Sequence, residues 1–392
     1  MSEKHDAGHE ALLAGRLAEA QELLEAALAD EPRSVKIRTD LGWAYYRAND
    51  FPRAAEHAER VPGFEAAAAK LRSFGDELPY HVSGPPKTEL PFVMGDLLPV
   101  VKIGVDGVDV YVLIDTGGAE LILDTEFAGE ISARRFGSQE GAFAGRATAA
   151  FEHGRVERVT LGDMELRRVP VAMLPTRRFS AITARRFLLV AYQLMPNILK
   201  RSLSGLSVGR YRIDGIIGTN LLAQFRATLD YPGERLVLVR DGAEPLAGVE
   251  VPFVTYEAHH MISREGWLNG VGPLGFFVDS GLAGAAFTCP ARTLERAGIT
   301  VPEVRHRGGM GGGGPVKSGR FKIEELGLGP LRQRNLTGVY IEPVSDEETE
   351  QEQRRDGIIS HSFLRNYRWT IDAKRSVFVF GEGWRSQSRR TG

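Results

Sequence analysis

Two stretches of this 392-residue chain repeat each other closely. Residues 214–230 and 356–372 are identical at eight of 17 positions and align without a gap. Each stretch is typical of a short apolar strand, followed by a short helix and a second strand. Repetition of this length, with an offset of 142 residues, predicts that the chain folds as two similar lobes that face each other.

Each half of the chain also has an aspartate at the end of an apolar run. Asp115 follows residues 108–114, and Asp279 follows residues 274–278. The end of a buried strand is a costly place for an ionised carboxylate, so two such residues indicate one shared reason. Two carboxyl groups a few ångströms apart cannot both ionise, which leaves one as an acid and the other as a base toward water. We therefore expect Asp115 and Asp279 to form a carboxylate pair.

The residues after each aspartate suit this pairing. Thr116 and Ser280 each add a hydroxyl group that can hold the loop in place. Gly117 and Gly281 permit backbone angles that other residues avoid. Either tripeptide alone is a weak signal, because Asp, Ser, Thr and Gly are ordinary residues of turns and helix caps. Their context is more specific, because a strand and a tight turn precede both of them.

The region from residue 90 to residue 381 resembles two lobes of a retropepsin-like aspartic protease fused in one chain. The resemblance implies a mainly β fold with two pseudo-symmetric β-barrel lobes, at residues 92–246 and 247–383, followed by a tail at 384–392. It implies that the two aspartates are catalytic. In each lobe of this family, a segment of two apolar residues and a glycine threads beside the catalytic loop. The corresponding residues here are Ile217 and Gly218 in the first lobe, and Ile359 and Ser360 in the second, where serine replaces glycine.

Members of this family close a glycine-rich flap over the substrate. The resemblance gives as flap candidates Gly309, Met310, Gly311 and Gly312 in the second lobe and Phe143 in the first. A plain flexible hairpin is the alternative, because a run of glycines loses much chain entropy on folding. The run also matches the glycine fingerprint of dinucleotide sites, but that fingerprint needs a following helix, and a strand-like pattern follows Pro315 instead.

Two other chemistries have weaker support in the sequence. Residues 205–209 fit the Gly-x-Ser-x-Gly pattern of serine hydrolases, but no buried strand leads into Ser207. The nine histidines are scattered, and the adjacent pair His259 and His260 lacks further ligands at zinc-like spacing. We therefore expect neither a metal nor a cofactor.

Residues 1–78 have a repeat pattern that differs from that of the two lobes. Gly8 and Gly42 are separated by 34 residues, as are Ala20 and Ala54, and this is the period of tetratricopeptide repeats. The spacing predicts an α-helical domain of two such repeats. Two repeats make only a small solenoid, which needs neighbours to bury its apolar face.

The end of this helical domain is also indicated by composition. An alanine-rich stretch at residues 64–74 predicts a capping helix, and the Gly-Pro-Pro within residues 79–91 predicts a linker to the first lobe. We expect the helical domain to dock on the lobes or on a partner. Its role is either to recruit a protein partner or substrate, or to serve as a structural cap.

Composition narrows the cellular setting. The net charge of −2 gives no global attraction to nucleic acid. The single cysteine, Cys289, excludes an intrachain disulfide and suits a reducing compartment. The first residues lead into no secretory apolar core, and the sequence has no 18-residue apolar run for a membrane span. We expect a cytoplasmic protein of bacterial type.

Two charge-biased segments interrupt the lobes. Residues 177–212 contain eight Lys or Arg and no acidic residue, around an apolar centre. This segment could pack on its lobe, cover the active site or lie on an anionic membrane surface, and we expect it to gate the cleft. Residues 342–356 contain seven acidic residues and predict a solvated loop.

These features together predict an aspartic endopeptidase whose two carboxyl groups activate a water molecule to hydrolyse a peptide or protein substrate. The alternative from another class is an inactive scaffold with a protease-like fold, which binds peptides or a membrane surface without cleaving anything.

Overall fold

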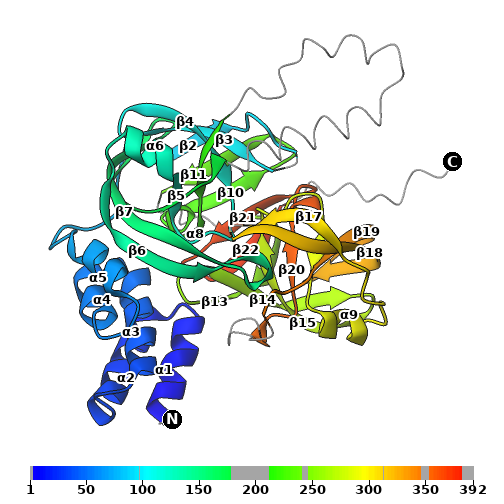
Figure 1. Cartoon of the computed structure of the whole chain (residues 1–392), viewed down its shortest axis with the longest axis horizontal. Coiled ribbons are helices and arrows are strands. Elements are labelled where there is room, and N and C mark those ends of the chain that lie inside the picture. The colour runs from blue at the N-terminus through cyan, green and yellow to red at the C-terminus, as the bar shows by residue number, and fades with distance from the viewer. Residues whose placement is uncertain are drawn as a thin grey trace.

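The computed structural model describes residues 3–96, 98–177, 212–240, 246–311, 313–345 and 353–381. Figure 1 shows a helical N-terminal domain, drawn in blue, and two β-rich lobes, the first cyan to green and the second yellow-green to red. The structure therefore confirms the predicted fold class of two β lobes preceded by helices.

Five helices make up the described part of the N-terminal domain. They are α1 (Glu3–Leu13), α2 (Leu17–Asp30), α3 (Val35–Arg47), α4 (Phe51–Ala58) and α5 (Glu65–Arg72). Two of them begin at a side-chain cap, because Ser34 accepts a hydrogen bond from the backbone N–H of Ile37 and Asp50 accepts one from that of Arg53. Helix α5 lies within the stretch for which a capping helix was predicted.

The helical domain docks on both lobes. The guanidinium of Arg47 donates a hydrogen bond to the carbonyl of Thr255 in the second lobe at 3.2 Å. Leu13 is buried there in a cluster with Phe277. On the other side, α5 packs against strands of the first lobe. The helical domain is therefore packed against both lobes.

The first lobe is an eight-stranded sheet in the order β1-β8-β5-β9-β4-β3-β7-β6. Its strands are β1 (His81–Ser83), β3 (Val100–Val105), β4 (Val108–Ile114), β5 (Leu121–Asp124), β6 (Arg134–Ala142), β7 (Thr148–Leu161), β8 (Met164–Leu174) and β9 (Ile213–Ile217). Two short helices, α6 (Thr125–Glu130) and α8 (Thr219–Leu222), and a 3-10 turn, η1 (Ala144–Arg146), complete it. Strand β9 is buried along its whole length, including its one charged residue, Asp214.

The second lobe has the order β13-β14-β15-β20-β16-β19-β18-β17. Its strands are β13 (Val254–Tyr256), β14 (His260–Leu268), β15 (Val271–Asp279), β16 (Phe287–Thr288), β17 (Arg305–Gly311), β18 (Gly314–Leu328), β19 (Leu331–Ile341) and β20 (Gly357–Ser360), with helices α9 (Ala291–Arg296) and α11 (His361–Leu364). Equivalent two-residue turns join the hairpins that lead to the two aspartates. These turns have positive φ at Asp106 and Gly107 in one lobe and at Asn269 and Gly270 in the other.

A six-stranded sheet joins the lobes in the order β12-β22-β21-β10-β11-β2. It consists of β12 (Val249–Pro252), β22 (Val377–Phe380), β21 (Arg368–Asp372), β10 (Arg226–Asp230), β11 (Arg235–Val239) and β2 (Lys87–Pro91). At its centre β10 and β21 pair antiparallel, and the hydroxyls of Thr228 and Thr370 hydrogen-bond at 2.7 Å. These threonines occupy equivalent positions in the two repeated stretches, so the pseudo-symmetry axis passes between them.

Residues 79–91, predicted to form a linker, belong instead to two of the sheets. This segment contains strand β1, which pairs with β8, and strand β2, which pairs with β11. Both are edge strands. A sheet edge tolerates proline because one side of the strand needs no hydrogen bonds, which explains how Pro91 can end a paired strand.

Several predictions fall outside the described residues. They are the Gly-x-Ser-x-Gly stretch at 205–209, nearly all of the basic segment 177–212, the flap candidate Gly312, residues 346–352 of the acidic segment and the tail at 384–392. Most of the dinucleotide fingerprint does lie within the described residues. Strand β18 follows it, whereas a nucleotide site would need a helix there.

Candidate active site

The two Asp-containing loops are placed by equivalent strands. Asp115 directly follows β4, and Asp279 ends β15. The threading residues run parallel to these strands, with Ile217 beside Ile114 and Ser360 beside Asp279. Each lobe therefore presents its aspartate from the same position of the same substructure.

Reciprocal hydrogen bonds lock the two loops together. The Thr116 hydroxyl donates to the carbonyl of Val278 at 2.8 Å and accepts from the backbone N–H of Ser280 at 3.0 Å. In the equivalent arrangement from the other lobe, the Ser280 hydroxyl donates to the carbonyl of Ile114 at 2.9 Å and accepts from the N–H of Thr116 at 3.1 Å. Both hydroxyl residues are fully buried, so these bonds fix the distance between the loops.

The carboxyl groups of Asp115 and Asp279 meet where the loops join. Each accepts a hydrogen bond from the backbone N–H two residues later, from Gly117 at 2.8 Å and from Gly281 at 2.7 Å. The loops bring the two carboxyl groups close together, because a Cβ atom on Gly281 would lie 2.2 Å from both carboxyl oxygens of Asp115 and one on Gly117 would lie 3.0 Å from Oδ1 of Asp279. Two carboxyl groups this close cannot both ionise, so the pair holds one proton between them.

The glycines after the aspartates are required by space. A Cβ atom on Gly281 would lie 2.0 Å from Cγ of Asp115, and one on Gly117 would lie 3.0 Å from Cγ of Asp279. Any side chain at Gly281 would push the opposite carboxyl group away. The close approach of the carboxyl groups therefore depends on the absence of a side chain.

Electrostatics favour retention of a proton by the pair. Burial raises the pKa of Asp115, although hydrogen bonds from Asp279 and Gly117 oppose the shift. Burial, and then the charge of Asp115, raise the pKa of Asp279 well above its usual range. The pair titrates as one unit, and its last proton is released at a higher pH than that of an ordinary carboxyl group.

The threading segments differ between the lobes at a single equivalent position. A Cβ atom on Gly218 would lie 2.3 Å from the carbonyl oxygen of Glu120, so only glycine fits there. Ser360 has room, and its hydroxyl donates to the carbonyls of Asp279 at 2.6 Å and Leu282 at 3.0 Å. The serine that departs from the family pattern thus supports the loop of Asp279.

A cavity of about 1050 Å³ surrounds the carboxyl pair. Among the flap candidates, Phe143 and Gly311 line it, while Gly309 and Met310 belong to strand β17. The tips of the two flap hairpins meet, because a Cβ atom on Gly311 would lie 3.0 Å from that of Ala144. The hairpins from both lobes therefore close over one cleft.

Sequence patterns did not indicate a role for His259. It lines the cleft, and the backbone of Gly117, in the loop of Asp115, affects its pKa. Burial lowers the pKa of His259 to about 4, so the ring is neutral near neutral pH. The ring of the adjacent His260 lies against it in a tilted arrangement and contacts Phe277 edge-on. This pair belongs to the active-site wall, a role that only the tertiary contact shows.

Tyr231 is buried within electrostatic reach of the carboxyl pair. Its hydroxyl is buried and has no hydrogen-bond partner among the described residues. Burial, and then the charges of Asp279 and Asp115, raise the pKa of Tyr231 far above its usual value. The phenol therefore stays neutral and leaves the pair surrounded by uncharged groups on that side.

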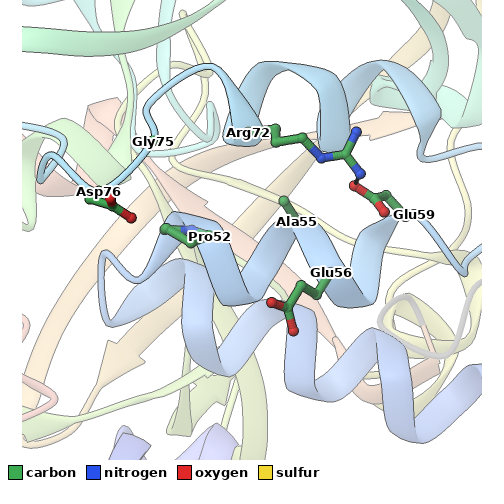
Figure 2. Close-up of a pocket in the computed structure, with 7 residues that line it drawn as sticks. All are labelled: Pro52, Ala55, Glu56, Glu59, Arg72, Gly75 and Asp76. Atoms are coloured by element: carbon green, nitrogen blue, oxygen red, sulfur yellow. Dashed lines mark ion pairs between the residues drawn. The ribbon is translucent and has the colours of Figure 1, made fainter.

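A smaller cavity of about 360 Å³ lies on the helical domain, between α4 and the end of α5 (Figure 2). It is lined by Pro52, Ala55, Glu56, Glu59, Arg72, Gly75 and Asp76. Arg72 and Glu59 form an ion pair across it, and Arg72 is 61% exposed. This cavity shares no lining residue with the cleft, and its charges are solvated, so it offers no comparable chemistry.

Within the described parts of the chain, no group of three or more His, Cys, Asp or Glu side chains could hold a metal ion. The helices described there are also too short or too polar to cross a membrane.

Two pseudo-symmetric lobes that each contribute one aspartate to a shared site define an aspartic-protease-like fold. A family model described as aspartyl protease matches residues 101–221 and 265–363, which together exceed half of the chain. The chain belongs to the aspartyl protease family. A second model, described as tetratricopeptide repeat, matches residues 11–73. A search of curated proteins found no match.

Proposed function

We propose that this chain is an aspartic endopeptidase. The observation that carries the proposal is the close approach of the Asp115 and Asp279 carboxyl groups inside a cleft formed by both lobes. The family assignment supports a hydrolase of this kind. Because the reciprocal bonds of Thr116 and Ser280 fix both loops, the pair is preorganised for one water molecule and one peptide bond.

The chemistry follows from the shared proton. The ionised carboxylate takes a proton from water while the water oxygen attacks the carbonyl carbon of the peptide bond. The other carboxyl group gives its proton to the carbonyl oxygen, which forms a neutral tetrahedral diol. The intermediate then collapses: the amide nitrogen accepts the proton of the protonated carboxyl group, the C–N bond breaks, and one hydroxyl of the diol gives its proton to the other carboxylate as the new carboxylic acid forms. The pair ends the cycle with one proton, as it began.

The cleft suits an extended polypeptide. Its volume of about 1050 Å³ lies at the upper end of the range of small-molecule sites. Phe143 and Gly311 bring flap backbone over the pair from both lobes. Exposed flap backbone can hydrogen-bond to a substrate strand whatever its side chains, which favours cleavage inside a chain.

The test uses the purified protein and a fluorogenic peptide library over a pH series. Asp115→Asn and Asp279→Asn should each lower kcat by about 10²–10⁴-fold, the contribution of a general acid or base. The matched control is Asp109→Asn, an exposed carboxylate on β4 that pairs with Lys102. If either active-site variant kept the wild-type rate, the shared pair would be wrong as the catalyst. If the wild type bound peptides and cleaved none at any pH, the inactive scaffold would replace the peptidase.

A further inference from the structure

The active-site cleft continues beyond the lobes onto the helical domain. The same cavity that holds Asp115 and Asp279 is walled on one side by α3, α4 and α5. The wall formed by these helices includes Arg38, Gly42, Trp43, Val61 and Phe64. We call this surface the helical wall. It extends the path of any chain that leaves the carboxyl pair in this direction.

A buried network attaches the helical wall to the loop of Asp115. The ammonium of Lys70 on α5 lies 2.6 and 2.7 Å from the carboxylate oxygens of Glu120, five residues after Asp115. The phenol of Tyr46 on α3 donates to the same carboxylate, and Asn220 donates to Tyr46 at 3.2 Å. Since Lys70 and Glu120 are 2% and 6% exposed, this network holds the wall at a fixed distance from the catalytic pair.

The middle of the wall is apolar. The ring of Trp43 lies 6.1 Å from that of Phe64 in an edge-on arrangement, and both rings are partly exposed toward the cavity. Gly42 leaves space beside them, because a Cβ atom there would meet nothing closer than 3.9 Å. Partly exposed aromatic rings beside open space can bury a large apolar side chain of a ligand.

Arg38 adds a charge one helical turn from Gly42. Its Nη2 donates to the carbonyl of Pro32 at 2.6 Å, whereas its Nη1 is buried without a partner among the described residues. The charge of Arg38 also contributes to lowering the pKa of His57, which places the guanidinium close to that ring. An unpaired buried donor of a guanidinium is costly, and a carboxylate is its best partner.

We propose that the helical wall is an extended substrate subsite, which binds the same polypeptide that the carboxyl pair cleaves. It receives a large apolar residue against Trp43 and Phe64 and, farther along, an acidic side chain at Arg38. The continuity of the cavity makes the substrate itself the occupant. The inference rests on the proposed peptidase function and gives it a specificity for long substrates with an apolar and an acidic residue away from the cleaved bond.

The experiment compares eight-residue peptides from the library with 16-residue versions extended on either side, which carry Phe and either Glu or Lys at scanned positions. For the wild type, extension on one side should raise kcat/KM about tenfold, and Glu should be preferred to Lys. Trp43→Ala should lower the ratio of long-peptide to short-peptide kcat/KM about tenfold, as expected for a lost apolar contact. Arg38→Glu should reverse the preference from Glu to Lys. The control Arg33→Gln changes an exposed arginine of the same domain and should alter neither ratio.

Binding to the Asp115→Asn protein, measured by fluorescence anisotropy with the same peptides, separates the two proposals. If long acidic peptides bind more tightly and Arg38→Glu reverses this preference, the subsite stands even where the wild type shows no cleavage. If the wild type cleaves peptides but length and charge change neither kcat/KM nor binding, the subsite is wrong and the peptidase remains. Because Trp43→Ala removes packing, its melting temperature is measured alongside, and Arg38→Glu decides the outcome if Trp43→Ala unfolds.

Discussion

Lys70 of the helical domain forms a buried ion pair with Glu120 of the active-site loop, with 2.6 Å between the ammonium and the nearer carboxylate oxygen. The carbonyl of Glu120 accepts a hydrogen bond at 3.0 Å from Gly218, the threading glycine. The side chain of Glu120 thus belongs to the domain contact, while its backbone belongs to the catalytic loop. The helical domain and the active site are therefore energetically linked.

Lys70→Met should destabilise the protein strongly. It leaves the Glu120 carboxylate buried without its cation, a loss of about 3–5 kcal/mol. Peptidase activity should fall with it, because the loop of Asp115 loses its support. Urea unfolding and peptide cleavage are the measurements. Lys4→Met is the matched control, since Lys4 pairs with Asp30 at 2.7 Å but is 52% exposed, and an exposed pair contributes at most about 1 kcal/mol.

Lys70→Met, Glu120→Gln and the variant with both substitutions form a double-mutant cycle. The double variant removes both charges, so its stability should recover part of the loss of Lys70→Met. Additive losses in the double variant would mean that the two residues do not interact, which would contradict the coupling between domain and loop.

Gly218 and Ser360 provide a pair of opposite substitutions at equivalent positions. Gly218→Ser should displace the Asp115 loop, because the new Cβ would lie 2.3 Å from the Glu120 carbonyl oxygen. A displacement of this kind can lower kcat about 100-fold. Ser360→Gly creates no clash and removes one hydroxyl donor, which the carbonyls of Asp279 and Leu282 share, so it should cost roughly 1 kcal/mol of stability and keep most of the activity.

Steady-state kinetics and thermal melts of both variants test this asymmetry. Equal effects of the two substitutions on kcat would show that the lobes use their threading segments alike, contrary to the contacts described above.

Much of the site could be predicted from sequence because it is carried by short repeated motifs. The offset of 142 residues between the repeated stretches brings Thr228 and Thr370 together, and the two tripeptides bring the aspartates together. These relations follow from pseudo-symmetry, since each lobe repeats the same local structure. The strands at residues 79–91 were missed because their pairing is at sheet edges, where proline is compatible with pairing but gives no strand signal.

The contact of the helical domain with the loop of Asp115 could not be predicted. Lys70 stands in an alanine-rich helix, where a lysine ordinarily faces solvent. Glu120 and His259 have no sequence motif of their own. Their contacts connect elements 50 or more residues apart, so they depend on the docking of whole domains, which local periodicity does not encode.

Asp279→Asn should change how stability depends on pH. The raised pKa of Asp279 means that the folded protein binds this proton more tightly than the unfolded chain does. In the wild type, this group therefore makes its full contribution to the free energy of unfolding below its ordinary pKa of 3.8. The contribution is lost as pH rises through the pKa of the folded pair. Asparagine cannot ionise, so the variant should be more stable than the wild type at neutral pH, by about 1.4 kcal/mol for each unit of the raised pKa.

Thermal melts of the two proteins between pH 3 and pH 8 measure this difference directly. Subtracting the wild-type stability from that of Asp279→Asn at each pH removes the contribution of the buried histidines, which is common to both proteins. Asp109→Asn, at an exposed carboxylate, should show no such trend. A constant difference between Asp279→Asn and the wild type across the series would mean that the Asp279 carboxyl group has an ordinary pKa.

His259→Ala and His259→Gln should separate the two properties of this residue. His259 lines the cleft with Asp115 and Gly117, and burial lowers its pKa to about 4. Alanine removes the imidazole ring from the cleft wall, so kcat should fall about tenfold with a smaller change in KM. Glutamine can keep a donor but cannot take up a proton. A histidine with a lowered pKa stabilises the folded protein above its ordinary pKa of 6.5, and this stabilisation is lost as pH falls toward 4. Because glutamine does not titrate, the glutamine variant should lose less stability in acid than the wild type. Cleavage rates and melts over pH 3–8 test both expectations, and an acid limb of stability identical in the wild type and His259→Gln would contradict the buried neutral ring.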